Sequence, residues 1–329
     1  MKILITGAAG YIGSHTLKLI LETTDAKVVG IDNFYSGSKE AIESLKKIRD
    51  FDFVECDLCD SAKLRELFKR YKFDAIIHFA AYIEVFESMQ NPIKYYQNNT
   101  ANALNLIALA REFKVNKFVF SSTAATYGEP KDGVVSEESL QNPINPYGKS
   151  KLMVEWALKD EGRADESFRY AILRYFNVAG ASSDGLLGQN YPNATHLIKV
   201  VCQTILGKRE KMSIFGDDYP TKDGTCIRDY IHIEDLALAH INALHYIDKN
   251  HSEVFNVGYG NGFSVKEVID RAKVVSGVDF KVEIAKRRDG DPAVLVSKVD
   301  KLINLTGWKP QKNDLSIIIK SSLEWEKRL

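Results

Sequence analysis

The sequence has 329 residues, of which 45% are hydrophobic and 27% are charged. These are ordinary values for a globular protein, and they exclude intrinsic disorder and a coiled coil. The 44 basic and 44 acidic residues balance, so the total charge indicates no binding to nucleic acid or to an anionic membrane. No apolar run approaches the roughly 20 residues of a membrane span, and residues 1–7 are too short and strand-like for a signal peptide. We therefore expect a cytoplasmic protein that binds neither nucleic acid nor membranes.

Short apolar runs alternate with amphipathic stretches over the first 176 residues. The apolar runs are residues 3–5, 28–31, 51–55, 75–79, 117–120 and 170–174. The stretches with helical spacing include residues 13–22, 38–49, 61–71 and 101–113. This alternation predicts an α/β fold with a doubly wound parallel sheet of the Rossmann type.

The character of the sequence changes after Asn177. Gly, Asn, Asp and Pro cluster at 180–193 and 216–229, which indicates long loops, and helical patterns follow at 236–246 and 265–275. We expect residues 1–176 to form the main domain and residues 177–329 a second, smaller domain that forms one wall of a cleft. Residues 253–259 resemble another strand, so a segment near 229–257 is expected to return to the main sheet.

Four cysteines stand at positions 56, 59, 202 and 226. Cys56 and Cys59 have the spacing of a metal or redox pair, but a tetrahedral site needs two further ligands at matching spacing. Cys202 and Cys226 lie far away in the sequence. We therefore predict buried thiols and no metal site.

Three glycines, Gly7, Gly10 and Gly13, follow the first predicted strand and open the first predicted helix. Glycines at this spacing allow a tight turn and let backbone N–H groups approach a pyrophosphate at the helix N-terminus. Asp32 ends the second strand, where a carboxylate accepts hydrogen bonds from both ribose hydroxyls and repels a 2′-phosphate. The pattern predicts NAD as the cofactor. Asp57, just after the third strand, is either a contact to the adenine edge or an ordinary loop carboxylate.

The spacing Tyr-x-x-x-Lys places two side chains on one face of a helix. It occurs three times, at Tyr35/Lys39, Tyr127/Lys131 and Tyr147/Lys151. With 15 tyrosines and 31 lysines in the chain, about 1.4 such matches are expected by chance, so context has to select among them. Only the third follows a helix start, in which Asn145 is the cap and Pro146 the first helical residue.

The selected pair suits proton transfer. A free phenol has a pKa near 10, so a tyrosine base at neutral pH needs its pKa lowered by about 3 units. A lysine ammonium one turn away and a cationic nicotinamide both act in that direction. Residues 121–123 end a strand at the carboxyl edge of the sheet and offer a hydroxyl to the same oxygen.

Together these features resemble the UDP-glucose 4-epimerases, a family within the extended short-chain dehydrogenases/reductases. The resemblance covers essentially the whole chain. The matching segments are residues 7–13, 32–33, 78–81, 95–99, 121–128, 145–153, 173–177, 214–219, 223–232 and 287–291. Each is unspecific alone, and their combination is highly specific.

The resemblance implies a reaction and a set of site residues. Tyr147 removes the proton of the sugar 4-OH while NAD takes a hydride from C4, the 4-keto sugar turns, and the hydride returns to its other face. Thr123 shares the hydrogen bond, and Lys151 holds the nicotinamide ribose and lowers the pKa of Tyr147. The implied cofactor contacts are Gly7, Gly10, Tyr11, Ile12, Gly13, Asp32, Asn33, Asp57, Phe79, Ala80, Asn98, Lys151 and Phe176. The implied contacts to the UDP-sugar substrate are Thr123, Tyr147, Asn177, Asn193, Phe215, Arg228, Arg288, Asp291 and Leu295.

Several positions depart from the pattern of this family. Ile83 stands where many epimerases have lysine, Ala125 where many have threonine, and Ala194 where some have a polar residue or leucine. Leu295 stands where epimerases confined to unacetylated sugars have tyrosine, so we predict activity on UDP-glucose/UDP-galactose and also on UDP-GlcNAc/UDP-GalNAc. The alternative is that Leu295 only packs the second domain.

Other functions on the same scaffold stay open at this point. Nucleotide-sugar 4,6-dehydratases resemble this chain but carry an Asp-Glu pair after the strand-end Thr, where Ala124 and Ala125 stand here. A UDP-uronate 4-epimerase would be expected to need further cationic groups near the sugar carboxylate. An NAD-sensing scaffold protein is the non-enzymatic alternative.

The resemblance also implies a homodimer, with the helices at 101–113 and 147–158 as candidate contact surfaces.

Overall fold

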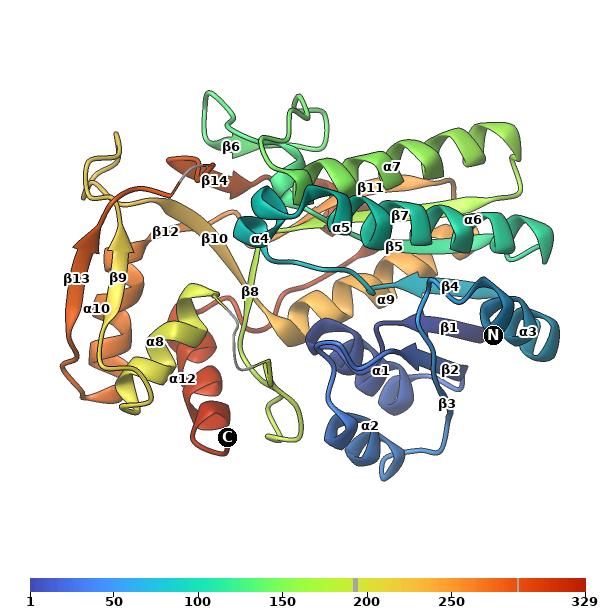
Figure 1. Cartoon of the computed structure of the whole chain (residues 1–329), viewed down its shortest axis with the longest axis horizontal. Helices are drawn as coiled ribbons and strands as arrows, with labels where there is room; N and C mark the ends of the chain where they lie inside the picture. Colours follow the sequence, from blue (N-terminus) through green and yellow to red (C-terminus); the bar gives the residue numbers. More distant parts are fainter. Residues whose placement is uncertain (192–194, 289) are drawn as a thin grey trace.

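A computed structural model describes residues 1–191, 195–288 and 290–329 (Figure 1). Within these ranges the largest sheet has seven strands: β1 (Lys2–Thr6), β2 (Lys27–Asp32), β3 (Asp52–Glu55), β4 (Ala75–His78), β5 (Lys117–Thr123), β7 (Arg169–Tyr175) and β11 (Glu253–Val257). All neighbours pair in parallel, in the order β11-β7-β5-β4-β1-β2-β3. The direction of winding reverses between β1 and β4, and ligands of such sheets bind at this point. The predicted doubly wound parallel fold is confirmed.

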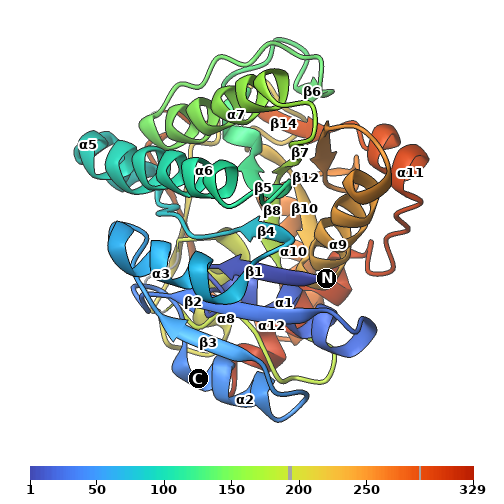
Figure 2. The same ribbon diagram turned by 90° about the vertical axis from the view of Figure 1, so that its right-hand side faces the viewer.

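Helices cover both faces of this sheet (Figure 2). On one face lie α1 (Tyr11–Thr23), α2 (Lys39–Lys46) and α9 (Ile233–Lys249), and on the other lie α3 (Ser61–Tyr71), α6 (Asn102–Glu112) and α7 (Pro146–Ala164). Between β4 and α6 the chain forms α4 (Val85–Gln90), α5 (Pro92–Tyr95) and a π-helical turn at Tyr96–Ala101. Strand residues alternate between the two faces, so Ile3 and Ile5 join one apolar core and Leu4 the other. This two-sided burial explains why the strands read as continuous apolar runs.

A second region is built mainly from residues after 176. Its strands are β8 (Asn177–Ala179), β9 (Met212–Phe215), β10 (Ile227–His232), β12 (Gly262–Ser264), β13 (Val282–Ala285) and β14 (Val294–Ser297), together with β6 (Val134–Val135) from the first part of the chain. Its helices are α8 (Leu197–Ile205), α10 (Val265–Ser276) and α12 (Leu315–Glu326), whereas α11 (Asp300–Thr306) packs against α9 and β11 of the main sheet. β10 pairs with β8, β12 and β14, and β9 pairs with β13.

The chain crosses between the two regions more than once. After β10, it returns through α9 and β11, and β11 pairs with β7 of the main sheet. The proposed division into residues 1–176 and 177–329, with a return near 229–257, stays a prediction. None of the helices in the described part of the chain combines the length and apolarity that a membrane crossing requires.

Candidate active site

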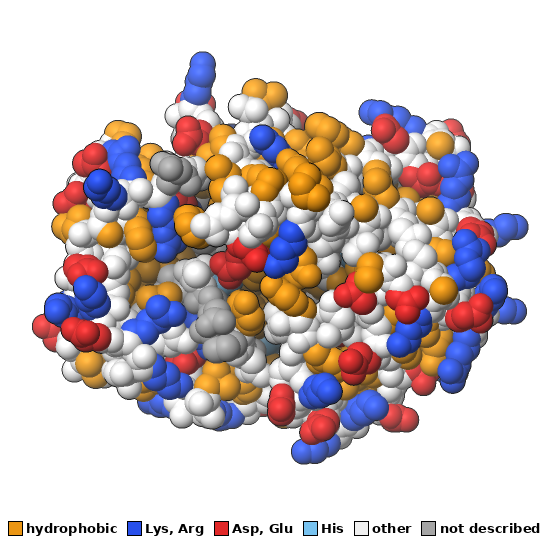
Figure 3. Space-filling view, viewed as in Figure 1, with side chains coloured by type: hydrophobic (Ala, Val, Ile, Leu, Met, Phe, Trp, Pro, Cys, Tyr) orange, Lys and Arg blue, Asp and Glu red, His pale blue; other side chains and the backbone are white. Residues whose placement is uncertain are grey.

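A cavity of about 1070 Å³ lies at the carboxyl edge of the main sheet and extends to the second region. Its lining includes the ends of β1, β2 and β5 and the segment after β4 on one side, and residues of β9 and β10 on the other. The face of the molecule in Figure 3 is hollowed between the two regions. Nearly all of the predicted site residues that the structure describes meet in this one cavity.

The glycine loop leaves no room for side chains. Gly7 has a φ of +70°, which favours glycine, and a Cβ on Gly13 would lie 2.0 Å from the Gly7 carbonyl oxygen. Gly10 is the N-cap residue of α1, without a side-chain cap, so the first N–H groups of α1 are free to bind an anion. The loop therefore has the shape and polarity of a pyrophosphate cradle.

Asp32 lies at the end of β2 beside this loop. Its Oδ2 accepts a hydrogen bond from Ala9 N at 3.0 Å and its Oδ1 one from Phe34 N at 2.8 Å. Burial raises the pKa of Asp32, and these backbone donors oppose that effect. Asn33, which follows β2, donates through its Nδ2 to Oδ2 of Asp57, which follows β3, at 2.6 Å. This hydrogen bond links two of the predicted cofactor residues. A carboxylate fixed beside a glycine cradle fits the adenosine half of a dinucleotide.

The other predicted cofactor residues continue the cavity wall. The residues that line it are Gly7, Gly10, Tyr11, Ile12, Gly13, Asp32, Asn33, Asp57, Phe79, Ala80, Asn98 and Phe176. Tyr11 Oη donates to the Gly180 carbonyl oxygen at 2.6 Å, which joins α1 to the segment after β8. The set as a whole fits NAD.

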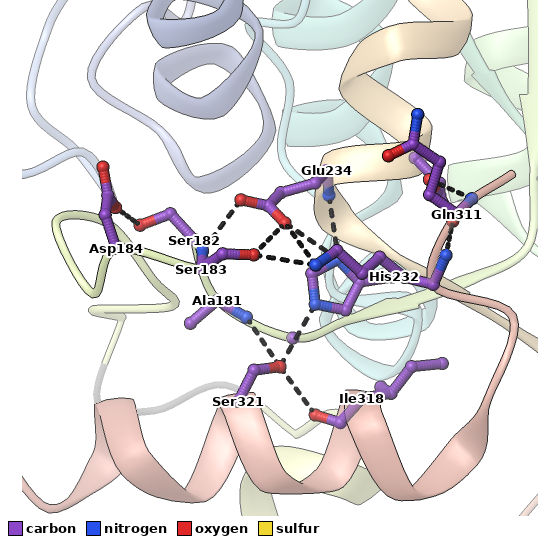
Figure 4. A network of polar contacts seen from close by, with 12 residues as sticks. Ala181, Ser182, Ser183, Asp184, His232, Glu234, Gln311, Ile318 and Ser321 are labelled. Atoms are coloured by element: carbon purple, nitrogen blue, oxygen red, sulfur yellow. Dashed lines mark hydrogen bonds and ion pairs between the residues drawn. The ribbon is translucent and has the colours of Figure 1, made fainter.

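The segment after β8 is itself braced by a polar network (Figure 4). Glu234 of α9 accepts hydrogen bonds from both N–H and hydroxyl of Ser183, at 2.8 and 2.7 Å. Ser321 of α12 lies 3.2 Å from His232 Nε2 and donates to the Ile318 carbonyl oxygen. These contacts anchor the loop that receives the Tyr11 hydroxyl.

Tyr147 and Thr123 face the cavity from α7 and the end of β5. The helix begins as predicted, since Asn145 Oδ1 accepts from Gly148 N at 2.8 Å and Pro146 is the first helical residue. Burial raises the pKa of the Tyr147 hydroxyl, and a hydrogen bond with Thr123 acts in the opposite direction. Both side chains are more than nine-tenths buried.

Lys151 lies one turn after Tyr147 but behind the cavity wall. Its Nζ donates to the Ser121 carbonyl oxygen at 2.9 Å and lies 5.0 Å above the centre of the Phe120 ring. Burial lowers the pKa of Lys151 to about 7. The helix spacing predicted for the pair is present, and the amino group rests on the backbone of β5.

The opposite end of the cavity carries the predicted substrate residues. Asn177, Phe215, Arg228, Arg288, Asp291 and Leu295 all line it. The Arg288 guanidinium lies 3.6 Å from the centre of the Phe215 ring, and Arg228 Nη2 lies 3.6 Å from Asp291 Oδ1. Asn193 and Ala194 lie outside the described residues.

Some residues around the site were missed from the sequence. Glu155 and Arg174 form a buried ion pair, and Glu155 also accepts a hydrogen bond from Ser122 of β5, but neither charged residue was assigned a role of its own from the sequence. Tyr35 and Tyr82 line the cavity, and the available signal for Tyr82 was its position in the segment that follows a predicted sheet strand. Among the described residues, no group of three or more His, Cys, Asp or Glu side chains is placed to hold a metal ion.

Comparison with known proteins decides the family. The sequence model of the NAD dependent epimerase/dehydratase family matches residues 3–258. This chain belongs to that family. A UDP-glucose 4-epimerase of Azospirillum brasilense is 46% identical over 331 residues, which cover 100% of this chain and 92% of that protein. The resemblance to the UDP-glucose 4-epimerases and the prediction of NAD as cofactor are confirmed.

Solved structures of this family superpose along the full chain. The UDP-Glc/GlcNAc 4-epimerase of Campylobacter jejuni is 61% identical, with a TM-score of 0.88 and coverage of 100% of this chain and 99% of that one. The UDP-glucose 4-epimerase of Bifidobacterium longum, solved in complex with NAD+ and UDP, is 36% identical, with a TM-score of 0.95. That comparison covers 100% of this chain and 98% of the other.

Proposed function

We propose that this chain is a UDP-glucose 4-epimerase, an isomerase that inverts C4 of a UDP-hexose with NAD as its cofactor. One observation carries the proposal: a single cavity joins the glycine cradle, the Tyr147 and Thr123 hydroxyls, and a distant end that contains Arg228 and Arg288. The sugar of a UDP-hexose bound by its diphosphate at the arginines would extend toward the two hydroxyls. This arrangement suits oxidation and reduction of the same carbon.

Tyr147 acts as the base in this proposal. Its phenolate takes the proton of the sugar 4-OH, and the phenol returns a proton to the carbonyl oxygen after the 4-keto sugar has turned. The Thr123 hydroxyl shares this hydrogen bond and lowers the pKa of the phenol against the effect of burial. NAD, when bound, accepts a hydride from C4 and returns it to the opposite face.

Lys151 and the predicted cofactor residues hold the nicotinamide half in place. The Lys151 amino group is buried at the end of β5, where a ribose hydroxyl can replace the Ser121 carbonyl oxygen as its acceptor. Burial has lowered the pKa of this amine, so an added hydrogen-bond acceptor stabilises its charged form. A charged Lys151 would in turn favour the phenolate of Tyr147.

The second end of the cavity binds the UDP. Guanidinium groups pair with diphosphate oxygens through two donors at once, and Arg228 and Arg288 offer this geometry from β10 and the loop before β14. Asn177, Phe215 and Asp291 complete the proposed nucleotide contacts.

Leu295 supports acceptance of N-acetylated sugars. It lines the cavity and packs in a small cluster with Ala124, Tyr127 and Phe176, so it borders the space beside Thr123. Leucine occupies less of this space than tyrosine, which leaves room for an acetamido group at C2. We therefore include UDP-GlcNAc and UDP-GalNAc among the proposed substrates. The similar Campylobacter jejuni protein is named a UDP-Glc/GlcNAc 4-epimerase.

Dehydration is a poor alternative for this site. Ala124 and Ala125 line the cavity directly after Thr123, and their methyl groups transfer no protons. A non-catalytic NAD sensor would not need a buried tyrosine and threonine at the point where the two ends of the cavity meet.

A homodimer is also part of the proposal. Leu104 of α6 and Met153 and Trp156 of α7 are exposed by 43%, 38% and 54%, although other apolar residues of both helices pack in the core. Hydrophobic side chains gather over the region of α4, α5 and α7 on the face in Figure 3. Two copies that pair through α6 and α7 would bury this surface. A cytoplasmic location stays a prediction from the sequence.

The proposal is tested by incubating the purified protein with UDP-galactose and no added NAD. We expect UDP-glucose to form until both sugars are at equilibrium, and the same with UDP-GalNAc. Because bound NAD is regenerated in each turnover, the copurified cofactor is sufficient. Absence of interconversion by protein that contains NAD would exclude this function.

A further inference from the structure

Two tyrosines meet across the cofactor end of the cavity. Tyr35 lies on the loop between β2 and α2, Tyr82 lies just after β4, and both line the cavity. Their ring centres are 4.6 Å apart. Because β1 stands between β2 and β4 in the sheet, a contact between the loops that follow β2 and β4 spans the end of β1. The glycine loop begins at this end.

Lys94 of α5 joins the two rings. Its Nζ donates to Tyr35 Oη at 3.1 Å and lies 4.5 Å from the centre of the Tyr82 ring and 5.2 Å from that of Tyr35. The same amino group donates to Glu87 Oε1 at 2.5 Å, and this bond raises the pKa of Lys94. Lys94 is therefore a charged group that contacts both rings and α4.

The two ends of this contact are held differently. Asn99 fixes the backbone of Tyr82, since its Oδ1 accepts from Tyr82 N at 2.8 Å and its Nδ2 donates to Tyr82 O at 3.0 Å. On the other side, Ser38 N donates to the Ala9 carbonyl oxygen at 3.0 Å. This bond attaches the end of the loop that carries Tyr35 to the glycine loop. Tyr35 itself is 50% exposed. Its outward side chain is thus held in place by Tyr82 and Lys94.

We propose that Lys94 fastens Tyr35 to Tyr82 as a strap across the NAD cleft, and that this strap slows the release of bound NAD. Opening requires the Tyr35 side chain to leave Lys94 and Tyr82, while the base of its loop stays on the glycine loop. Retention of the cofactor serves any reaction in which the hydride taken from a substrate must return to it. The strap concerns the lifetime of the bound cofactor, which is separate from the identity of the sugar substrate.

The test measures NAD release from the intact protein. The protein is loaded with radiolabelled NAD, diluted into excess unlabelled NAD, and sampled for retained label. Lys94→Met keeps the aliphatic stem and removes the charge, and it is expected to speed release about five- to tenfold. Tyr35→Ala is expected to speed it by a similar factor. Lys69→Met on α3, which removes a lysine whose ion pair is with Glu66, serves as the matched control and should release NAD at the unmodified rate.

A double variant shows whether Lys94 and Tyr35 slow NAD release through one shared contact or through two independent ones. If Lys94 and Tyr35 act in one strap, Tyr35→Ala combined with Lys94→Met releases NAD no more than about twofold faster than either single variant. Multiplication of the two effects, or release at the unmodified rate in both single variants, would overturn the proposal.

The salt dependence of NAD release shows whether the strap acts through the charge of Lys94 or whether the substitution merely disturbs the fold. Raising salt from about 50 mM to about 500 mM screens the exposed contacts of Lys94, so release from the unmodified protein should quicken more than release from Lys94→Met. Equal salt dependence in the two proteins would contradict the role of the Lys94 charge. Thermal unfolding without NAD verifies that each variant is folded, and Tyr35→Ala alters only a half-exposed side chain.

Discussion

Glu155, two helical turns after Tyr147 on α7, forms an ion pair with Arg174 of β7, with 2.6 Å between Oε2 and Nη2. Both side chains are at most 1% exposed. Ser122 also donates to Glu155 Oε1 at 2.5 Å, and its neighbour Thr123 lines the cavity of the candidate active site. Glu155 thus joins the helix that carries Tyr147 to β7 through Arg174, and to β5, the strand that carries Thr123, through Ser122.

Breaking this pair should destabilise the fold. Glu155→Ala leaves the Arg174 charge buried without its partner, and we expect a loss of about 3–5 kcal/mol in the free energy of unfolding. Urea unfolding followed by circular dichroism measures this loss. Glu66→Ala on the surface of α3 should change the same quantity by less than about 1 kcal/mol. Equal losses of unfolding free energy in the two variants would refute a stabilising role of the buried Glu155–Arg174 pair.

Tyr147→Phe should remove the proposed base and keep the binding sites. We expect turnover of UDP-galactose to fall by about 10²–10⁴-fold, while bound NAD and affinity for UDP stay near those of the unmodified protein. Tyr127→Phe is the comparison, because Tyr127 belongs to another Tyr-x-x-x-Lys pair and its hydroxyl bonds to Arg174 and Asn256. That variant should lose stability and only modest activity. A Tyr147→Phe enzyme with near-normal turnover would exclude Tyr147 from the chemistry.

Lys151 should make the stability of the NAD-free protein depend on pH. Burial lowers its pKa to about 7, whereas the ordinary value of 10.5 applies to the unfolded chain. Between these pH values the unfolded chain holds a proton that the folded chain lacks, so this contribution to stability is lost as the pH falls from about 10.5 to 7. The full loss is at most about 5 kcal/mol. Lys151→Met should reduce the difference in unfolding free energy between pH 7 and pH 9.5, and an unchanged difference would contradict the lowered pKa.

The fold and the cofactor cradle could be predicted because their signals are local. The glycine loop, the Asp32 carboxylate and the Asn145-Pro146 helix start each depend on neighbours within a few residues. Contacts between distant segments could not be predicted in this way. Arg174 sits inside an apolar run, and nothing local indicates that its partner is Glu155 on the preceding helix.

The contacts of the strap residues likewise could not be predicted from local sequence signals. Tyr35 appeared in the sequence only as one member of a chance Tyr-x-x-x-Lys pair, and its actual cation partner is Lys94 rather than Lys39. This pairing depends on the order of β4, β1 and β2 in the folded sheet. The placement of Lys151 against the Ser121 carbonyl oxygen is likewise a property of the packed helix and strand.

Leu295→Tyr should narrow the range of substrates. Leu295 is 8% exposed and lines the cavity, so the larger ring would occupy the space assigned to a C2 acetamido group. We expect a loss of at least tenfold in kcat/KM for UDP-GalNAc and less than about threefold for UDP-galactose, because the clash falls on one substrate pair. Steady-state assays with both sugars measure this ratio. Equal losses on both substrates would indicate general damage and remove the specificity role of Leu295.

The central claim is that the hydride taken from C4 of a UDP-hexose returns to the same carbon. Its most direct test uses UDP-galactose deuterated at C4, with mass spectrometry and NMR of the UDP-glucose formed by the purified protein in ordinary water. We expect the product to retain the deuterium at C4 with inverted configuration. Loss of the label to solvent, or its appearance at another carbon, would contradict the proposed reaction.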